Sequence, residues 1–424
     1  MSDKRLNIID NCGNVDFPDL EFDQSEVNQQ IDAESILATT ACALKEEVIR
    51  ALGLQGYTLT DNSFHLSDID KEKIRSLHSR ARLERIYRHI KFMESKADFA
   101  QKYMLNSDEL EVDKIAPRII EVSANSKYAK LFQWWNLVWW SLPCERAYGR
   151  QMRFVIWDDY HNAPIGLVGL QSPILKWKVR DDFLGIDSEK RDYWINQSMN
   201  AQRLGSLPPY NKFLGGKLVS MLMSCDEIRK RYQDKYDKRE TLLIKRVIPS
   251  NLLFITTTGA YGKSSVYNRL RFKDSRICEF IGYTNGSGSF HIPDTLYESL
   301  MNYLSLAGIK VGRYFGSGPS VKIKNIDRSM RLLGFKKGSN HGIKRASYIF
   351  PLVDNLHAVL QKDENPIWKQ RSIDELTEFW KQRWAVKRTG DYPKENLVFK
   401  KDEFMLEARK EWEQSKTLFE IDRS

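Results

Sequence analysis

The segment from Leu306 to Ser347 concentrates side chains that could bind phosphate groups. It contains ten lysines and arginines against one acid, Asp327. Positive charges at this density repel one another unless a polyanion neutralises them. A nucleic-acid backbone is such a polyanion, and its binding releases counterions. Glycine-containing turns in the segment would add backbone amides beside the charges. The pattern favours a nucleic-acid surface, and a solvated basic face is the alternative.

Two spacings within this segment predict how the charges are presented. Arg328 and Arg331 are three residues apart on an expected helix, so they would share one face. Lys322 and Lys324 alternate along PSVKIKN, which predicts a strand with both on one side. The full predicted contact set is Lys322, Lys324, Arg328, Arg331, Lys336, Lys337, His341, Lys344 and Arg345.

A glycine pair in FLGGKL, residues 213–218, lies at the expected start of a helix. Gly215 and Gly216 would let a backbone approach a ligand phosphate, which the free amides and the dipole of a helix N-terminus favour. Lys217 would add a point charge. The motif is neither a P-loop nor a dinucleotide fingerprint, so a tight strand-to-helix turn is the alternative.

Two tyrosines in TTTGAYGKSSVYNRLRF, residues 256–272, could be catalytic. The run Y-N-R-L-R-F resembles a segment of GCN5-related N-acetyltransferases, and this resemblance implies that Tyr267 is a general acid beside the thiol of coenzyme A. Arg271 replaces the glycine of that family's segment, and K-F-L-G-G-K departs from its pyrophosphate motif. Tyr267 or Tyr261 could instead be a nucleophile that nicks or transfers a DNA strand, and a nucleobase-modifying enzyme is a further alternative.

Composition limits the other classes of site. The five cysteines are scattered without a CxxC pair, and no histidine or acid pair has metal-ligand spacing, so we assign no metal and no disulfide framework. No cofactor is assigned, apart from coenzyme A under the acetyltransferase alternative. The chain carries a net charge of +10, but residues 1–36 contain nine acids and two bases, a net −7 that leaves +17 for the rest. The longest apolar stretch, at 131–143, is too short to span a bilayer, so we expect a cytoplasmic protein without membrane association.

The expected architecture is α/β (α+β), with a mixed-sheet core resembling an acetyltransferase-like fold between N- and C-terminal helical regions. Helices are expected over 33–53, 67–105, around 187–200, and over 346–361, 372–387 and 401–416, with a further short helix in GKSSVYNRLRF. Residues 210–236 are expected to be a glycine-containing turn that leads into a long helix. Hairpins are expected at 153–173 and around Asn285-Gly286, with strands at 201–209 and 252–261. The tryptophans at 134, 135, 139 and 140 are interpreted as core, with a base-stacking platform as the alternative. The expected divisions are an acidic flexible leader (1–32), a helical module (33–125), the α/β core (126–300), a basic α/β segment (301–360) and C-terminal helices (361–424).

Several long segments together resemble the DruA family of the Druantia anti-phage defence systems. They include PIGLVGLQSP, RLGSLPPYNKFLGGKLVSML, GYTNGSGSFH, GSGPSVKIKNI and NHGIKRASYIFPL, in an order that covers about residues 70–360. The resemblance implies a bacterial antiviral role beside other Druantia proteins, including a helicase-like partner, and it supplies no catalytic residue. The leading hypothesis is therefore a component of a defence complex that binds DNA or RNA.

Overall fold

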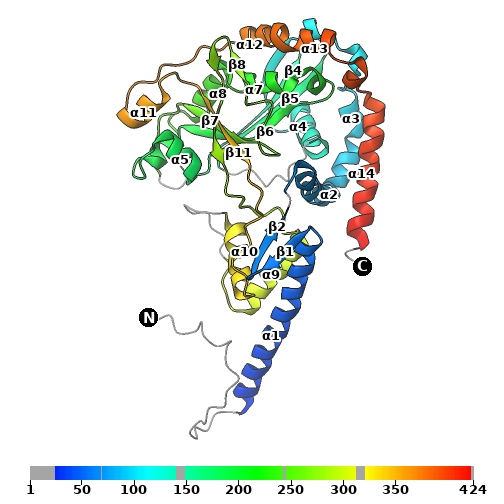
Figure 1. The fold of residues 1–424 in the computed structure, drawn as a ribbon, viewed down its shortest axis with the longest axis vertical. Coiled ribbons are helices and arrows are strands. Elements are labelled where there is room, and N and C mark those ends of the chain that lie inside the picture. The colour runs from blue at the N-terminus through cyan, green and yellow to red at the C-terminus, as the bar shows by residue number, and fades with distance from the viewer. Residues whose placement is uncertain (1–23, 68, 140–148, 242–244, 312–319, 422–424) are drawn as a thin grey trace.

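A mixed β-sheet forms the centre of the computed structural model, which describes residues 24–67, 69–139, 149–241, 245–311 and 320–421 (Figure 1). In these ranges seven strands pair in the order β10-β11-β7-β6-β5-β4-β3. All neighbours are antiparallel except β6 and β7, which are parallel. The expected α/β class with a mixed sheet is thus confirmed. The strands are β3 (Pro117–Glu121), β4 (Gln151–Asp158), β5 (Ala163–Gln171), β6 (Ser198–Ser206), β7 (Phe254–Thr258), β10 (Glu279–Tyr283) and β11 (Ala346–Pro351).

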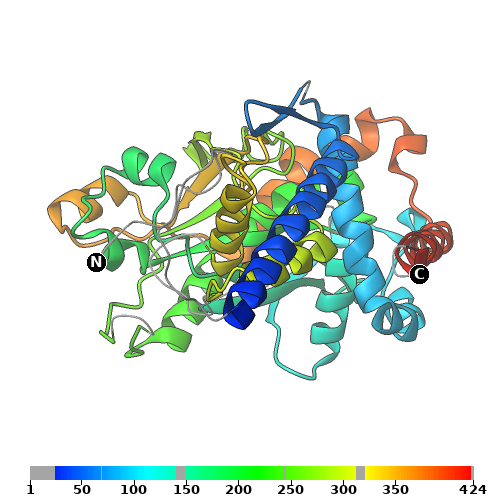
Figure 2. The same ribbon diagram turned by 90° about the horizontal axis from the view of Figure 1, so that it is seen from below.

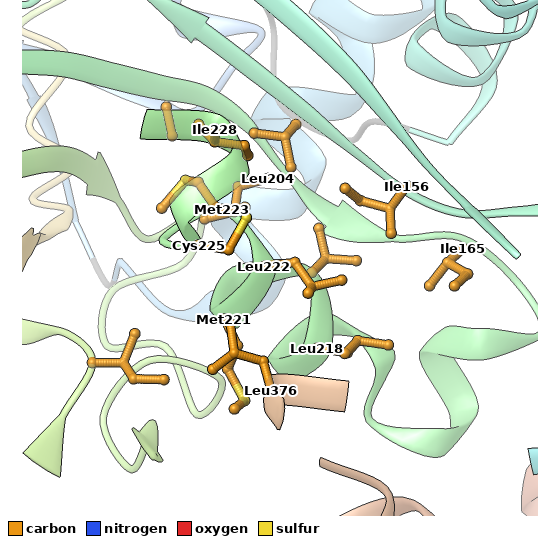
Figure 3. Close-up of a cluster of buried hydrophobic side chains, with 14 of the residues drawn as sticks. Ile156, Ile165, Leu204, Leu218, Met221, Leu222, Met223, Cys225, Ile228 and Leu376 are labelled. Carbon is orange, nitrogen blue, oxygen red and sulfur yellow. The ribbon is translucent and has the colours of Figure 1, made fainter. Parts of the chain in front are cut away.

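Side-chain alternation along the strands builds one hydrophobic core on each face of the sheet. On β4, Phe154 and Ile156 join a core with α7 (Gly215–Leu222), α8 (Asp226–Tyr236) and α12 (Ile373–Trp380), part of which Figure 3 shows. Val155 and Trp157 point to the opposite face. That face is covered by α2 (Lys71–Ser95), α3 (Ala97–Gln101), α4 (Lys127–Val138) and α14 (Lys401–Ile421).

Smaller elements complete this part of the molecule. Three short helices pack with Phe254 of β7 and Ile349 of β11. They are α5 (Lys178–Leu184), α6 (Arg191–Ile195) and α11 (Leu356–Lys362). A π-helical turn (Lys381–Ala385) joins α12 to α13 (Val386–Asp391), and β8 (Arg271–Phe272) pairs with β9 (Ser275–Arg276). Single 3₁₀ turns cover Ser107–Glu109, Val112–Lys114, Tyr210–Phe213 and Lys394–Leu397.

A separate hydrophobic cluster brings residues 44–77 into contact with residues 292–343. It contains residues of α1 (Gln24–Gly53), the hairpin of β1 (Tyr57–Thr60) and β2 (Ser63–Leu66), the start of α2, and α9 (Asp294–Leu306) with α10 (Val321–Leu332). Figures 1 and 2 show α1 beside α9 and α10, in a lobe on one side of the sheet. We call this part the α1–α10 lobe. Most of the expected acidic leader, residues 1–23, lies outside the described ranges, and α1 already begins at Gln24.

The tryptophan cluster is core, as predicted, for the residues that the structure describes. Trp134 and Trp135 of α4 are fully buried, and the Trp134 indole N–H donates to the carbonyl of Met93 at 3.1 Å. Trp139 is half-buried, and Trp140 lies outside the described residues. These rings stabilise the packing of α4 on α2 and leave no exposed stacking platform at Trp134 and Trp135.

Several expected elements are wrong. Residues 346–351 are a strand and not the start of a helix. The prediction failed because every residue of β11 is buried, and a short apolar run has no period that distinguishes a strand from a helix. GKSSVYNRLRF forms turns that end in the short strand β8, and β10 pairs with β11 instead of with GSFHIP. The long helix expected within 210–236 is divided into α7 and α8. The expected helical module of residues 33–125 also contains β1 and β2, and it contributes β3 to the edge of the sheet.

The other predicted hairpin and the C-terminal helices are confirmed. β4 and β5 pair antiparallel around the turn at Asp159–Asn162, and α12 begins after Ser372, whose hydroxyl accepts from the amide of Glu375 at 3.2 Å. Among the described residues, none of the helices combines the length and apolar character needed to cross a bilayer.

Candidate nucleic-acid interface

Helix α10 presents three of the predicted cationic side chains to solvent. Lys324, Arg328 and Arg331 are exposed and follow one another at i, i+4 and i+7, so they share a face. On the opposite face, Ile326 and Met330 are fully buried in the core of the α1–α10 lobe. The predicted sharing of a face by Arg328 and Arg331 is therefore confirmed, on a helix that packing fixes in place.

The expected strand at PSVKIKN is wrong, because these residues form the first turns of α10. The hydroxyl of Ser320 caps the helix by accepting from the amide of Ile323 at 3.3 Å. Lys322 consequently points away from Lys324: its ammonium pairs with Asp294 at 2.9 Å and lies 5.0 Å from the ring centroid of Tyr297. Lys322 is thus engaged with α9, and Lys324 is the member of the pair that is exposed.

The turn after α10 adds three more exposed lysines, Lys336, Lys337 and Lys344. The carboxylate of Asp327 holds this turn against the helix, because it accepts from the amide and the hydroxyl of Ser339 at 2.8 and 3.0 Å. In the described ranges, none of the exposed cations of this region forms an ion pair. We call the following set the α10 basic segment: Lys324, Arg328, Arg331, Lys336, Lys337 and Lys344.

Two predicted contact residues have structural partners instead. His341 is buried, and its Nδ1 accepts from the amide of Ile343 at 3.1 Å. Burial lowers the pKa of His341 to about 3, so the ring is neutral at pH 7 and does not fit a cationic phosphate contact. Arg345 donates to Nε2 of His78 on α2 at 3.1 Å and lies 5.7 Å from the ring centroid of Phe290.

Three buried histidines, His78, His291 and His341, surround Phe290 at ring-centroid distances of 5.0, 5.8 and 4.8 Å. Desolvation lowers the pKa of His78 to about 3, with a contribution from Arg345, and that of His291 to about 4. The cluster joins α2, the 286–291 loop and the 338–345 loop through neutral rings. Throughout the described part of the chain, no group of three or more His, Cys, Asp or Glu side chains could hold a metal ion.

The glycine pair begins α7, as predicted, but the surroundings of Gly215 explain that residue without a ligand. A Cβ at Gly215 would lie 2.6 Å from the carbonyl oxygen of Tyr210, so glycine is needed for close packing. The Lys217 ammonium donates to the carbonyls of Val266 and Ser265 at 3.2 and 3.4 Å. Burial lowers the pKa of Lys217. A tight, packed turn therefore accounts for Gly215 and Lys217, whereas a Cβ at Gly216 would meet no atom closer than 3.5 Å.

The candidate tyrosines are not presented as reactive groups. Tyr267 is buried with ring centroids of Tyr348 and Phe350 at 5.0 and 5.8 Å, and desolvation raises the pKa of its phenol, which disfavours a phenolate nucleophile. The ring of Tyr261 is half-buried, 5.4 Å below the guanidinium of Arg75. The structure places Gly216 and Lys217 against Ser265 and Val266, directly before Tyr267. Tyr261 packs against the core of the α1–α10 lobe instead, so the predicted site residues do not form one site.

Sequence reasoning missed a second group of exposed arginines, Arg269, Arg271, Arg276 and Arg383, which line a common cavity. The signal was present in R-L-R-F-K-D-S-R, residues 269–276, where three arginines and a lysine stand against one acid. Arg383 is more than 100 residues further along the chain, so its place beside them depends on the fold.

Gly338 is expected to be indispensable for the geometry of the turn after α10. A Cβ there would lie 2.3 Å from Cγ of Met330 and 2.9 Å from Cγ2 of Ile326. We expect Gly338→Ala to cost about 1–3 kcal/mol through overpacking, measured as a lower Tm. The matched control is Gly390→Ala in α13, where nothing lies within 4 Å of the new Cβ, and it should leave Tm unchanged or slightly raised. Equal Tm values for the two variants would contradict the packing argument.

Comparison with known proteins gives a consistent family match. The family described as Druantia protein DruA matches residues 68–362 of this chain. A curated relative, Druantia protein DruA of Escherichia coli (strain UMEA 4076-1), is 34% identical over 367 residues, which cover 85% of this chain and 91% of the relative. No solved structure matches the chain.

Proposed function

Because this chain belongs to the DruA family of Druantia proteins, we propose that it is a nucleic-acid-binding component of a bacterial anti-phage defence complex. In this proposal the protein acts in the cytoplasm beside other Druantia proteins, including a helicase-like partner. Its ligand is DNA or RNA. Its contribution is to bind nucleic acid and to assemble with those partners.

One observation carries the nucleic-acid part of the proposal. The α10 basic segment presents cations from a helix and turn that are packed against a core, and none of them has an acidic partner among the described residues. Because the backbone that carries these cations is already ordered by packing, binding requires ordering of the side chains alone. Each phosphate contact also releases condensed counterions. The net charge of +10 acts in the same direction.

We also propose that the core is an acetyltransferase-like scaffold. This is supported by the parallel pair β6 and β7 within an otherwise antiparallel sheet, and by α7, which follows β6 and begins at the glycine pair. A scaffold does not establish an activity. The buried Tyr267 and the packed Lys217 do not favour acyl transfer, base modification or strand nicking, so binding and assembly are the preferred function.

Binding of nucleic acid by the purified protein should depend steeply on salt. With about three to five phosphate contacts, the log–log slope should be about −2.7 to −4.5, so the affinity should fall roughly 40- to 500-fold between ~50 and ~200 mM salt. Fluorescence anisotropy with single- and double-stranded DNA and RNA would measure this and rank the four ligands. If none of the four binds at low salt, or if the affinity is independent of salt, the proposal is wrong.

A further inference from the structure

Four exposed arginines from three parts of the chain surround a cavity of about 320 Å³ beside the sheet. Arg269 precedes the β8–β9 hairpin, Arg271 and Arg276 lie on it, and Arg383 lies on the π-helical turn after α12. The hairpin and α12 are in contact, because the ring centroids of Phe272 and Phe379 lie 5.3 Å apart. Packing of the β8–β9 hairpin against α12 therefore brings Arg383 to the same cavity as the arginines of the hairpin.

Positive charges gather in this cavity. Arg271 and Arg276 are direct cross-strand partners in the β8–β9 hairpin, and like charges in that position destabilise a hairpin. In the described part of the chain, none of the four arginines forms an ion pair, and Glu279 is the acid that lines the cavity with them. An uncompensated cluster of this kind is stabilised by a bound anion.

The position of Arg383 is the second sign of a ligand site. A π-helical turn interrupts the end of α12, and such turns occur frequently at functional sites. The guanidinium of Arg383 lies 5.6 and 5.9 Å from the ring centroids of Trp384 and Phe379, which restrict where it can point. The positive charge of the cavity also acts on the interior of the protein. Burial lowers the pKa of Lys217, and the charges of Arg269 and Arg383 lower it further.

The rest of the cavity wall suits a planar group next to the anion. Phe280 lines it and is 39% exposed, with the ammonium of Lys263 5.1 Å from its ring centroid. Asn268 also lines it, and its amide oxygen accepts from the hydroxyl of Tyr348 at 2.9 Å. The backbone amide of Asn268 donates to the carbonyl of Ser264 at 3.1 Å. Its side-chain N–H groups have no acceptor among the described residues, so they are available to a ligand oxygen.

We propose that this cavity binds the phosphate of a nucleotide on its arginines, with the base against Phe280. A guanidinium group can donate two parallel hydrogen bonds to the oxygens of one phosphate. Aromatic rings stack on nucleic-acid bases of any sequence. The nucleotide is either free or the terminal unit of a nucleic-acid strand. Figure 1 shows β8 beside α12 at one end of the molecule and α10 in the opposite lobe, so the site is distinct from the α10 basic segment. The inference therefore does not depend on the proposed function.

Calorimetry with five probes tests the assignment: inorganic phosphate, adenosine, adenosine 5′-monophosphate, and a short DNA strand with or without a 5′-phosphate. We expect the monophosphate to bind at least tenfold more tightly than adenosine. A tenfold preference for the 5′-phosphorylated strand identifies a strand end as the ligand, and equal affinity for the two strands identifies a free nucleotide. Phe280→Ala should weaken binding of the monophosphate at least fivefold and leave that of inorganic phosphate unchanged.

Three variants separate binding at this cavity from folding and from binding at the α10 basic segment. Arg276→Gln should raise the Tm of the ligand-free protein, because it removes the repulsion from Arg271, and should also weaken the monophosphate complex. Arg276→Gln with Arg383→Gln should weaken that complex at least tenfold. Arg328→Glu with Arg331→Glu should leave it unchanged, so that failure at one surface is not confused with failure at the other. No binding of any phosphorylated probe, or unchanged affinity in the Gln double variant, would overturn the proposal.

Discussion

Reversal of two charges on α10 is expected to abolish most nucleic-acid binding. Arg328→Glu with Arg331→Glu replaces two exposed cations on one helix face by two anions. If each arginine contacts one phosphate, the log–log salt slope should become shallower by about 1.8, and repulsion by the new carboxylates should weaken binding further. We expect at least a 100-fold loss of affinity at ~50 mM salt, measured by anisotropy, and loss of protection in cells that carry the complete defence system.

The matched control keeps the change in net charge and moves it elsewhere. Lys230 on α8 and Lys410 on α14 are exposed and without an ion pair among the described residues. Lys230→Glu with Lys410→Glu should reduce affinity only slightly, through the general field. Both double variants should keep the parental Tm within a degree or two, because exposed charges change stability by roughly 0.5 kcal/mol or less. If the α10 variant is folded, binds normally and still protects, this surface is not the interface.

Mild acid is expected to destabilise the protein sharply through the three buried histidines. Their pKa values of about 3, 4 and 3 for His78, His291 and His341 lie below the ordinary value of 6.5. The unfolded chain therefore binds more protons than the folded chain below pH 6.5. Stability is fully present above that pH and is lost as the pH falls from 6.5 toward 3–4. At pH 5 each histidine contributes a loss of about 2 kcal/mol, or roughly 6 kcal/mol together as an upper value.

Urea unfolding at pH 7.5 and pH 5.0 measures this effect, and two conservative variants assign it. His78→Gln keeps an acceptor near Nε2 for Arg345, and His341→Asn keeps one near Nδ1 for the amide of Ile343. The double variant should lose about two thirds of the pH dependence. His65→Gln, at an exposed position on β2, is the control and should retain all of it. Equal pH dependence in the double variant and the parent would show that other groups cause the loss.

The sequence predicted the elements whose signals are local. The β4–β5 hairpin follows from its apolar strands and intervening turn, and the start of α12 follows from the Ser372–Glu375 capping pair. It could not predict β11. Like β5, this strand is buried on both faces and has no alternation to read, but β5 is marked by its hairpin turn, whereas β11 runs on toward the helix α11. In α10, the K-I-K alternation suggested a strand, although the apolar spacing of Ile326 and Met330 continues a helix that Ser320 caps.

For the candidate site, sequence identified the charges but not their partners. Lys322 and Lys324 are the same residue type two positions apart, yet one pairs with Asp294 and the other is exposed. Arg345 has its partner only because α2 supplies His78 from more than 250 residues away, and His341 packs against Phe290 and His291 about 50 residues before it. Charge density along the chain can be counted before folding, whereas the neutralisation of each charge depends on contacts that folding creates.

The α1–α10 lobe has a consequence for the order of events during biosynthesis. Leu44, Val48 and Leu52 of α1 are buried against residues of α9, α10 and Ile343. At a ribosomal rate of about 5–20 residues per second, roughly 15–60 seconds pass between synthesis of the first part of this core and synthesis of the last. During most of that interval, until α9 is synthesised at residues 294–306, the apolar face of α1 has no native partner from α9 or α10. The nascent chain therefore exposes an amphipathic helix while the central sheet is being assembled, and transient shielding of that face by a chaperone would protect it from aggregation.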